Sequence, residues 1–291
     1  MSKIKFIFLT ALFSVFYYSP LYAKSPVWKV TKGDKLLFIG GTIHLLSKDD
    51  YPLPSSFNLA FNASEDIIFE TDIESAQSLT TQAKFLQVLM YQDGKTIEDD
   101  LKPETYDALV AFLEDRNLPV SMFTRFTPAG INMTLVVLEL QGLGITGESG
   151  VEAYFNSQSK AQEKDVMWLE TIDEQVSFIG RINDLDADLV TNSTLRDIKK
   201  LKDEWPKLLS AWREGDMDRL ESLAINEMIN ESPELYQFLL ADRNKNWVPE
   251  IKRMLDSPEV EFVLVGALHL AGKDSVLTML ANEGFKIEQL D

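Results

Sequence analysis

The chain of 291 residues contains no cysteine. Disulfide bonds, thiolate metal sites, lipid-modified cysteines and cysteine nucleophiles are therefore excluded. Basic residues are few: 28 Lys and Arg stand against 46 Asp and Glu, giving a formal net charge of −18. Such an acidic surface repels a phosphate backbone, so we expect no nucleic-acid partner. Beyond residue 23, no apolar run reaches the roughly 20 residues of a membrane-spanning helix, and we expect no stable membrane insertion.

The first 23 residues have the composition of a signal peptide. Lys3 and Lys5 give a basic start, residues 6–18 form an apolar core, and residues 21–23 end in a small alanine suited to cleavage. The alternative is an uncleaved N-terminal anchor, for which the apolar core is short. We therefore expect an exported protein, periplasmic or secreted, whose mature chain spans residues 24–291.

Short apolar runs predict a central sheet. They are mostly continuous rather than alternating, which is typical of strands that helices cover on both faces. We therefore expect an α/β fold with a mostly parallel central sheet, built from strands at residues 27–30, 36–39, 67–69, 166–169, 262–265 and 285–290.

The segments between these runs carry apolar residues at spacings of three and four, which predicts helices. Pro206 predicts a kink or a helix start within its segment, and Thr171 with Glu174 forms a capping-box pattern. Because residues 73–165 show little strand pattern, we expect them to form a large helical insertion between the early and middle core strands of a single domain. Helices are expected at residues 76–91, 103–114, 198–212, 217–229 and 233–254.

The chain has only two histidines, and both lie in the same local pattern. His44 and His269 each follow an apolar run and a Gly-x-x-His-Leu motif. Ligands of an open α/β sheet bind beyond the carboxyl ends of its strands, and the glycine of each motif permits a tight turn there. If the two strands are neighbours, the imidazoles can meet. The alternative, in which each histidine is only a satisfied polar residue at a strand end, does not explain the matched pattern.

Carboxylates follow two other strands at the position where a ligand would bind. Glu70 and Asp72 come directly after the run 67–69, and Glu170 follows the run 166–169. Two imidazoles and a carboxylate are a common metal-ligand set, so we expect Glu70 to complete the site of the two histidines. Glu170 or Asp72 could then act as a neighbouring acid or base, although in an acidic chain each could equally be a solvated surface group.

Other catalytic patterns are absent or weak. Residues 142–147 match the dinucleotide pattern G-x-G-x-x-G, but no compact strand–helix–strand unit surrounds them, and we expect a loop. No Gly-x-Ser-x-Gly elbow is present. A Ser-His-Asp triad would leave one of the two matched histidines unexplained.

In their order along the chain, these motifs resemble the TraB/PrgY/GumN family, which includes the animal TIKI metalloproteases. The resemblance covers nearly the whole mature chain. It rests on the segments 41–44, 69–72, 168–175, 243–247 and 265–272.

The resemblance implies an α/β core with a helical insertion, related to the erythromycin-esterase and ChaN-like superfamily. It also implies a metal-dependent hydrolase site with manganese or cobalt. Residue by residue, the family's two histidines match His44 and His269, and its acid matches Glu70. Arg243 matches a family arginine implied to pair with an acidic or carbonyl group, and Glu152 stands where many relatives carry aspartate.

We therefore expect an exported metal-dependent hydrolase, a peptidase in the first instance, acting on a peptide or small-molecule substrate. A Mn, Co, Fe or Zn ion would polarise the carbonyl and lower the pKa of its bound water. The alternative is a non-catalytic envelope protein that binds a peptide, metal or haem. Residues 122–126 are a candidate lining for its apolar groove, although ordinary helix packing is the simpler interpretation of that run. A third possibility is an inactive relative that acts as a scaffold.

Overall fold

The computed structural model describes residues 24–76 and 78–291, and the signal peptide expected at 1–23 lies outside them. The described strands form one six-stranded mixed sheet in the order β4-β3-β5-β2-β1-β6. The strands β4, β3, β5 and β2 pair in parallel, while β1 is antiparallel to both β2 and β6. The strands are β1 (Val27–Lys32), β2 (Lys35–Thr42), β3 (Asp66–Phe69), β4 (Asp165–Trp168), β5 (Glu261–Gly266) and β6 (Lys286–Gln289).

The α/β class expected from the sequence is confirmed, and each of the six apolar runs lies in or overlaps a strand. The sheet is mixed because β1 and β2 form a hairpin. Its two-residue turn begins at Gly33, whose φ of 63° lies in the left-handed region that favours glycine. The parallel arrangement is confined to the four strands β4, β3, β5 and β2, which include those preceding both histidines.

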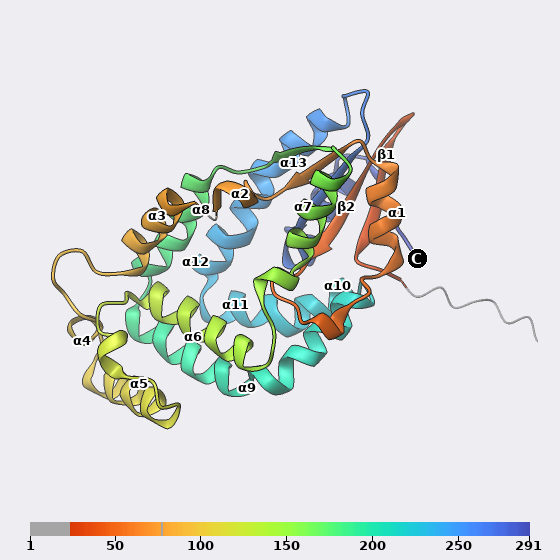
Figure 1. Ribbon diagram of the computed structural model, residues 1–291. Coiled ribbons are helices and arrows are strands. Elements are labelled where there is room, and N and C mark those ends of the chain that lie inside the picture. Colours follow the sequence, from red (N-terminus) through yellow and green to blue (C-terminus); the bar gives the residue numbers. More distant parts are fainter. Residues whose placement is uncertain (1–23, 77) are drawn as a thin grey trace, which may run out of the picture.

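Helices fill the long segments between the strands (Figure 1). Before β4 they are α1 (Ser55–Ala63), α2 (Ile73–Ala76), α3 (Leu79–Leu89), α4 (Ile97–Asp100), α5 (Pro103–Asp115), α6 (Pro128–Gly142) and α7 (Val151–Ala161). After β4 they are α8 (Ile172–Gly180), α9 (Ala187–Arg213), α10 (Met217–Leu220), α11 (Asn226–Glu231), α12 (Pro233–Tyr236), α13 (Asp242–Met254) and, beyond β5, α14 (Val276–Asn282). None of the helices in the described ranges combines the length and apolar character needed to cross a membrane.

Shorter helical turns join these elements. The 3-10 turns are η1 (Lys48–Asp50), η2 (Val120–Met122), η3 (Gly147–Ser149), η4 (Arg181–Asp184) and η7 (Ala267–Leu270). Two π-helical turns, η5 (Glu221–Ile225) and η6 (Gln237–Ala241), interrupt segments expected to be regular α-helix. Thr171 and Glu174 form the expected capping box of α8. Pro206 lies inside α9, so the expectation that it starts a helix is wrong: α9 begins after Asp186, whose side chain accepts the Leu189 N–H.

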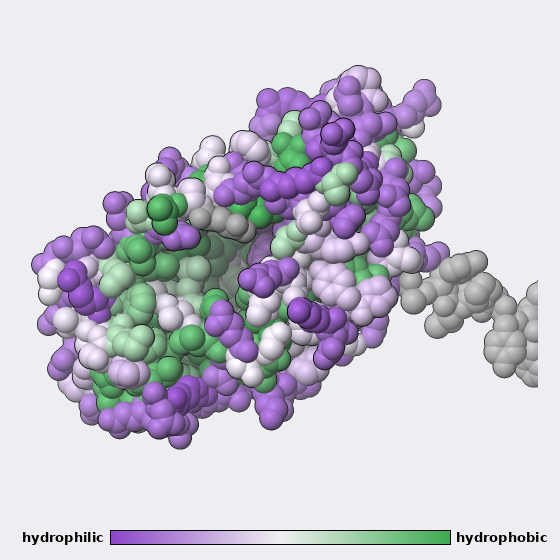
Figure 2. Space-filling model, in the orientation of Figure 1, coloured by the Kyte–Doolittle hydropathy of each residue, from purple (hydrophilic) through white to green (hydrophobic). Residues whose placement is uncertain are grey.

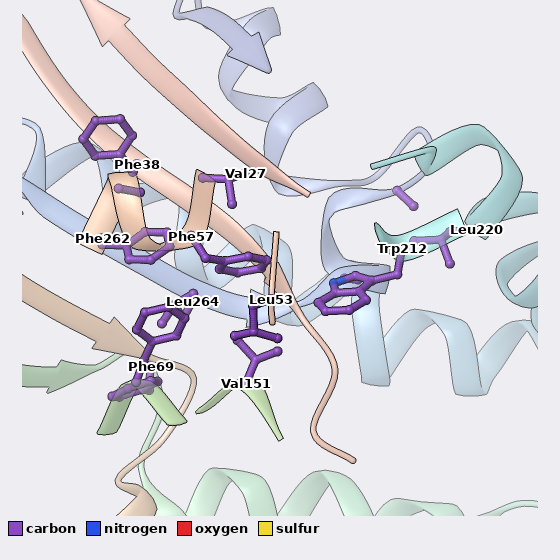
Figure 3. Packing of buried hydrophobic residues seen from close by; sticks show 14 of the residues in the cluster. Val27, Phe38, Leu53, Phe57, Phe69, Val151, Trp212, Leu220, Phe262 and Leu264 are labelled. Carbon is purple, nitrogen blue, oxygen red and sulfur yellow. The ribbon is translucent and has the colours of Figure 1, made fainter. Parts of the chain in front are cut away.

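The two faces of the sheet carry different apolar clusters. One face packs against α13 and α14 through Trp247, Ile251 and Leu280. The other packs against α1, α7 and the end of α9, where Phe57, Phe155 and Trp212 are fully buried; Figure 3 shows Phe57 and Trp212 in this cluster. A further cluster joins α4, α5, α6 and α9 away from the sheet. The helices between β3 and β4 thus have apolar packing of their own, while α7 returns to cover the sheet.

Candidate functional site

The two Gly-x-x-His motifs lie side by side in the structure. Strands β2 and β5 pair in parallel, with Thr42 opposite Gly266, so both motifs leave the sheet at the same edge. A Cβ atom added to Gly266 would lie 3.2 Å from Glu70 Oε1, 3.6 Å from His269 Cδ2 and 3.7 Å from His44 Nε2. The structure therefore brings together the three residues that the sequence singled out, around a glycine that leaves space between them.

The two histidines differ sharply in exposure. His269 lies in η7, and only 5% of its side chain is exposed, whereas 62% of the His44 side chain is exposed. The His269 imidazole packs against the Trp247 ring, with ring centroids 4.3 Å apart. His44 lies at a bend two residues after β2. Of this pair, only His44 is freely accessible to a reactant.

His269 is held as a neutral imidazole. Its Nδ1 lies 2.6 Å from Asn244 Oδ1, while Asn244 Nδ2 donates to the carbonyls of His269 and Asp274. The amide orientation makes Asn244 Oδ1 an acceptor, so Nδ1 carries the proton. His269 Nε2 then accepts from Arg243 Nη1 at 3.1 Å. Burial lowers the pKa of His269 to about 3, which agrees with this assignment.

Glu70 is held as a carboxylate. Its Oε1 accepts the backbone N–H of Gly266 at 2.6 Å, and its Oε2 accepts from Arg243 Nη2 at 2.7 Å. Burial acts to raise the pKa of Glu70, but the positive charge of Arg243 and the hydrogen bond from the Gly266 N–H outweigh it and hold this pKa below its usual range. Glu70 is therefore a fixed negative charge beside the histidines rather than a base of ordinary strength.

Arg243 joins the two buried carboxylates. In addition to Glu70, it donates from Nε and Nη2 to Glu170, at 2.9 Å and 2.8 Å. Glu170 also accepts from Trp247 Nε1 at 2.8 Å and from Gln175 Nε2 at 2.9 Å. Four donors thus surround the carboxyl group of Glu170, which favours its ionised, acceptor-only form even though burial raises its pKa.

His44 has a carboxylate partner of its own. Its Nδ1 lies 2.7 Å from Glu152 Oε1, and the hydroxyl of Thr42 donates to the same oxygen. The Glu152 charge raises the pKa of His44 from its ordinary value of 6.5 to about 9. With Nδ1 engaged by Glu152, Nε2 is the nitrogen left facing Gly266 and Glu70.

Gly150 allows the start of α7, which carries Glu152, to approach His44 closely. Glu152 lies in the first turn of α7, and the Val151 N–H donates to the Ile43 carbonyl at 3.1 Å. A Cβ on Gly150 would come 2.1 Å from the His44 carbonyl oxygen, so only glycine permits this approach. The backbone contact fixes α7 against the first Gly-x-x-His motif.

The arrangement does not fit a metal ion held by His44, Glu70 and His269. Within the residues that the structure describes, no three His, Asp or Glu side chains are placed to share an ion. Arg243 already donates to His269 Nε2 and to Glu70 Oε2, and Glu70 Oε1 accepts the Gly266 N–H, so each of these atoms already has a hydrogen-bond donor. A guanidinium at this position also repels a second cation.

The remaining sequence candidates lie outside this cluster. Asp72 accepts the backbone N–H groups of Glu74 and Ser75, and so caps α2 instead of facing the histidines. Residues 142–147 form the expected loop, because the preceding segment belongs to α6 and is not a strand. In the segment 122–126, the Phe123 side chain is buried and its ring packs against Phe126 in a helical cluster, so this run packs a core and does not line a groove.

Several residues of the site had no role assigned from the sequence. Trp247 stands four positions after Arg243 and three after Asn244, so on α13 it neighbours both of them. That spacing was readable in the segment 243–247. The pairing of Glu152 with His44 spans 108 positions, and its only local sign was the Gly-Val-Glu sequence at 150–152.

Comparison with known proteins places these residues in a family. The sequence model of the TraB/PrgY/gumN family matches residues 26–289. The chain is 24% identical to the uncharacterized protein YbaP of Escherichia coli strain K12, over 85% of this chain and 89% of YbaP. It is similar to the same extent to the uncharacterized protein YbaP of Shigella flexneri. No solved structure matches the chain.

Proposed function

We propose that this chain, which belongs to the TraB/PrgY/gumN family, is an exported hydrolase that uses His44 to activate water against an ester or amide carbonyl. The observation that carries the proposal is the His44–Glu152 pair. It combines an exposed imidazole, a carboxylate 2.7 Å from its Nδ1, and a free Nε2 beside Gly266. A histidine oriented by a carboxylate is a recurring general base of hydrolases.

In the reaction, neutral His44 keeps its Nδ1 proton in a hydrogen bond to Glu152 and accepts a second proton, from water, at Nε2. The resulting hydroxide attacks the carbonyl carbon of the substrate, forming a tetrahedral oxyanion. The imidazolium then returns the proton to the leaving oxygen or nitrogen as the bond to carbon breaks. Glu152 stabilises the imidazolium throughout, which is the role that its effect on the pKa of His44 describes.

The buried residues act as positioning groups in this proposal. Glu70 and Glu170 carry two negative charges, Arg243 neutralises one of them, and neutral His269 adds none. The net charge of this buried group is therefore negative. The Glu70 carboxylate, which lies near His44 around Gly266, favours the protonated form of His44. Because hydrogen bonds from at least two elements fix each of these groups, the space around Gly266 keeps its shape when a reactant enters.

The site contains two carboxylate–histidine pairs, His44 with Glu152 and His269 with Glu70. Their histidines differ in how far solvent can reach them. His269 faces Glu70 at 3.9 Å, but its Nε2 accepts from Arg243, and only 5% of its side chain is exposed. A base must reach the water that it activates. The greater exposure of His44 therefore favours it over His269 as the base.

A metal-dependent form of the same proposal comes from the family resemblance, with a divalent ion drawn from Mn, Co or Zn on His44, Glu70 and His269. Two imidazoles and a carboxylate do lie around Gly266, but they are not placed to share an ion. It requires Arg243 to leave the atoms that it now occupies. We assign no step to an ion for that reason, and the assay below separates the two forms.

The test is multiple-turnover hydrolysis of p-nitrophenyl acetate and of a fluorogenic peptide pool by the purified protein. Each substrate is assayed with chelator and with added Mn²⁺, Co²⁺ or Zn²⁺. His44→Gln is compared with Glu148→Gln, an exposed site outside the cluster. We expect turnover that chelator leaves unchanged, a loss of roughly 10²–10⁴-fold in His44→Gln, and no loss in Glu148→Gln.

Each other outcome has a defined meaning. Turnover only with added metal replaces the present mechanism with the metal-dependent form. Equal turnover in His44→Gln and wild type removes His44 from the chemistry. Absence of turnover under all conditions, with stoichiometric protection of one peptide, favours the alternative of an envelope binding protein.

A further inference from the structure

An apolar cavity opens directly beside the two histidines. It has a volume of about 400 Å³, and Thr42, His44 and His269 form its wall at the strand ends. The opposite wall comes from α6, α9, α10 and the two π-helical turns. Its side chains are hydrocarbon or indole: Val136, Leu140, Trp205, Leu208, Leu220 and Leu240. Figure 2 shows this face of the molecule hollowed, with hydrophobic residues gathered along its helical side.

The helical wall offers almost no hydrogen-bonding group to an occupant. Two indoles line the cavity, and the N–H of Trp212 donates to the carbonyl of Gly41 at 2.7 Å, which leaves the N–H of Trp205 as the remaining side-chain donor of the helical wall. A peptide backbone in such a cavity would leave N–H and C=O groups without partners, which is costly. An occupant without polar groups pays no such penalty, so the wall favours a hydrocarbon chain over a peptide.

The position of the cavity beside His44 indicates which part of a substrate would bind in it. His44 borders it at one side, and the scissile carbonyl must lie at His44 in the function proposed above. An apolar group bonded to that carbonyl would extend from the histidines toward the helices. The volume lies in the range of about 300–1,000 Å³ typical of small-molecule sites.

We propose that this cavity binds the acyl chain of the substrate, so that the protein acts on esters or amides of medium-length saturated acids. The inference rests on the proposed function for the chemistry, but the binding of an alkyl chain does not require turnover. Ala224, in the π-helical turn η5, lines both this cavity and a neighbouring one of about 330 Å³. Its small side chain therefore lies at the boundary that limits how far a chain can extend.

The first experiment measures the binding of alkyl probes by calorimetry, using hexanoate, octanoate and decanoate and the matching 1-alkanols. Each added methylene is worth about 0.8 kcal/mol when buried, so we expect Kd to fall about fourfold per methylene. Ala224→Phe, which inserts a ring at the boundary, is expected to abolish the gain between octanoate and decanoate. Ala281→Phe, at an exposed position of α14, serves as the matched control and is expected to keep it.

The second experiment measures kcat/KM for p-nitrophenyl acetate, hexanoate, octanoate and decanoate. We expect a similar rise with chain length, and a fall in the decanoate-to-acetate ratio of at least tenfold in Ala224→Phe but not in Ala281→Phe. Circular dichroism and melting temperature verify that Ala224→Phe is folded. If it does not fold, Leu208→Gln, which adds a polar group to the same wall, is used with the same expectation.

The outcomes separate this inference from the proposed function. Chain-length-dependent binding that Ala224→Phe reduces supports the cavity assignment even if no ester is turned over. Turnover without chain-length dependence in either experiment overturns the acyl site and leaves the role of His44 standing. Preference for a peptide over every alkyl probe also overturns it.

Discussion

Replacing Glu170 by glutamine removes one of the two carboxylate charges that balance the buried guanidinium of Arg243. Glu170 is 4% exposed and accepts hydrogen bonds from Arg243, Trp247 and Gln175. In the glutamine variant, the amide NH₂ must face donors that previously met a carboxylate oxygen. Removing one partner of a buried ion pair costs about 3–5 kcal/mol. We expect a value near the lower end, about 3 kcal/mol, because Glu70 still pairs with Arg243.

The assay is urea unfolding at pH 7, supported by thermal unfolding. A domain of this size loses about 2–4 °C of Tm per kcal/mol, so the expected decrease is about 6–12 °C. Glu148→Gln removes an exposed carboxylate and is expected to change the free energy of unfolding by less than about 0.5 kcal/mol. A change below about 1 kcal/mol in Glu170→Gln would refute the reasoning, since the network could then not be what fixes the guanidinium.

Two further predictions concern the other groups around Gly266. The folded-state pKa of His269, about 3, lies below its ordinary 6.5, so the stability that it contributes above pH 6.5 is lost as pH falls toward 3. Urea unfolding from pH 7 to pH 4 should show stability falling by up to about 1.4 kcal/mol per pH unit more in wild type than in His269→Gln; parallel curves would contradict this. In Gly266→Ala, the new Cβ would lie 3.2 Å from Glu70 Oε1 and 3.7 Å from His44 Nε2, filling the space for water. Turnover should fall about tenfold or more, unlike in Gly142→Ala, where a Cβ meets nothing within 4 Å; equal rates would contradict this.

The fold was readable from the sequence where local pattern and burial agree. The continuous apolar runs before Gly41 and Gly266 gave the strands, and two matching motifs implied two neighbouring strand ends. The same reasoning placed Glu70 at that edge, where the structure brings it beside His44 and His269. Parallel strands carry such information because each ends on the same side of the sheet.

The electrostatic character of the site was not readable. The two matching motifs predict the same role for His44 and His269. In the structure, His44 is exposed beside Glu152, whereas His269 is buried beside Arg243. That difference depends on contacts between α7, α13 and the sheet, which no local pattern encodes. The expectation of a metal ion arose from the donor types, whereas the position of Arg243 shows that two of those donor atoms are already engaged.

The dependence of ester hydrolysis on pH, in the presence of chelator, tests the role of His44 most directly. Because the Glu152 charge raises the pKa of His44 to about 9, the base form grows as pH rises, and kcat/KM should increase up to that pH. In Glu152→Gln, which lacks that charge, the increase should move toward the ordinary value of 6.5, with a lower maximum. The same profile in wild type and Glu152→Gln, or a rate that falls as pH rises toward 9, would contradict proton transfer by His44.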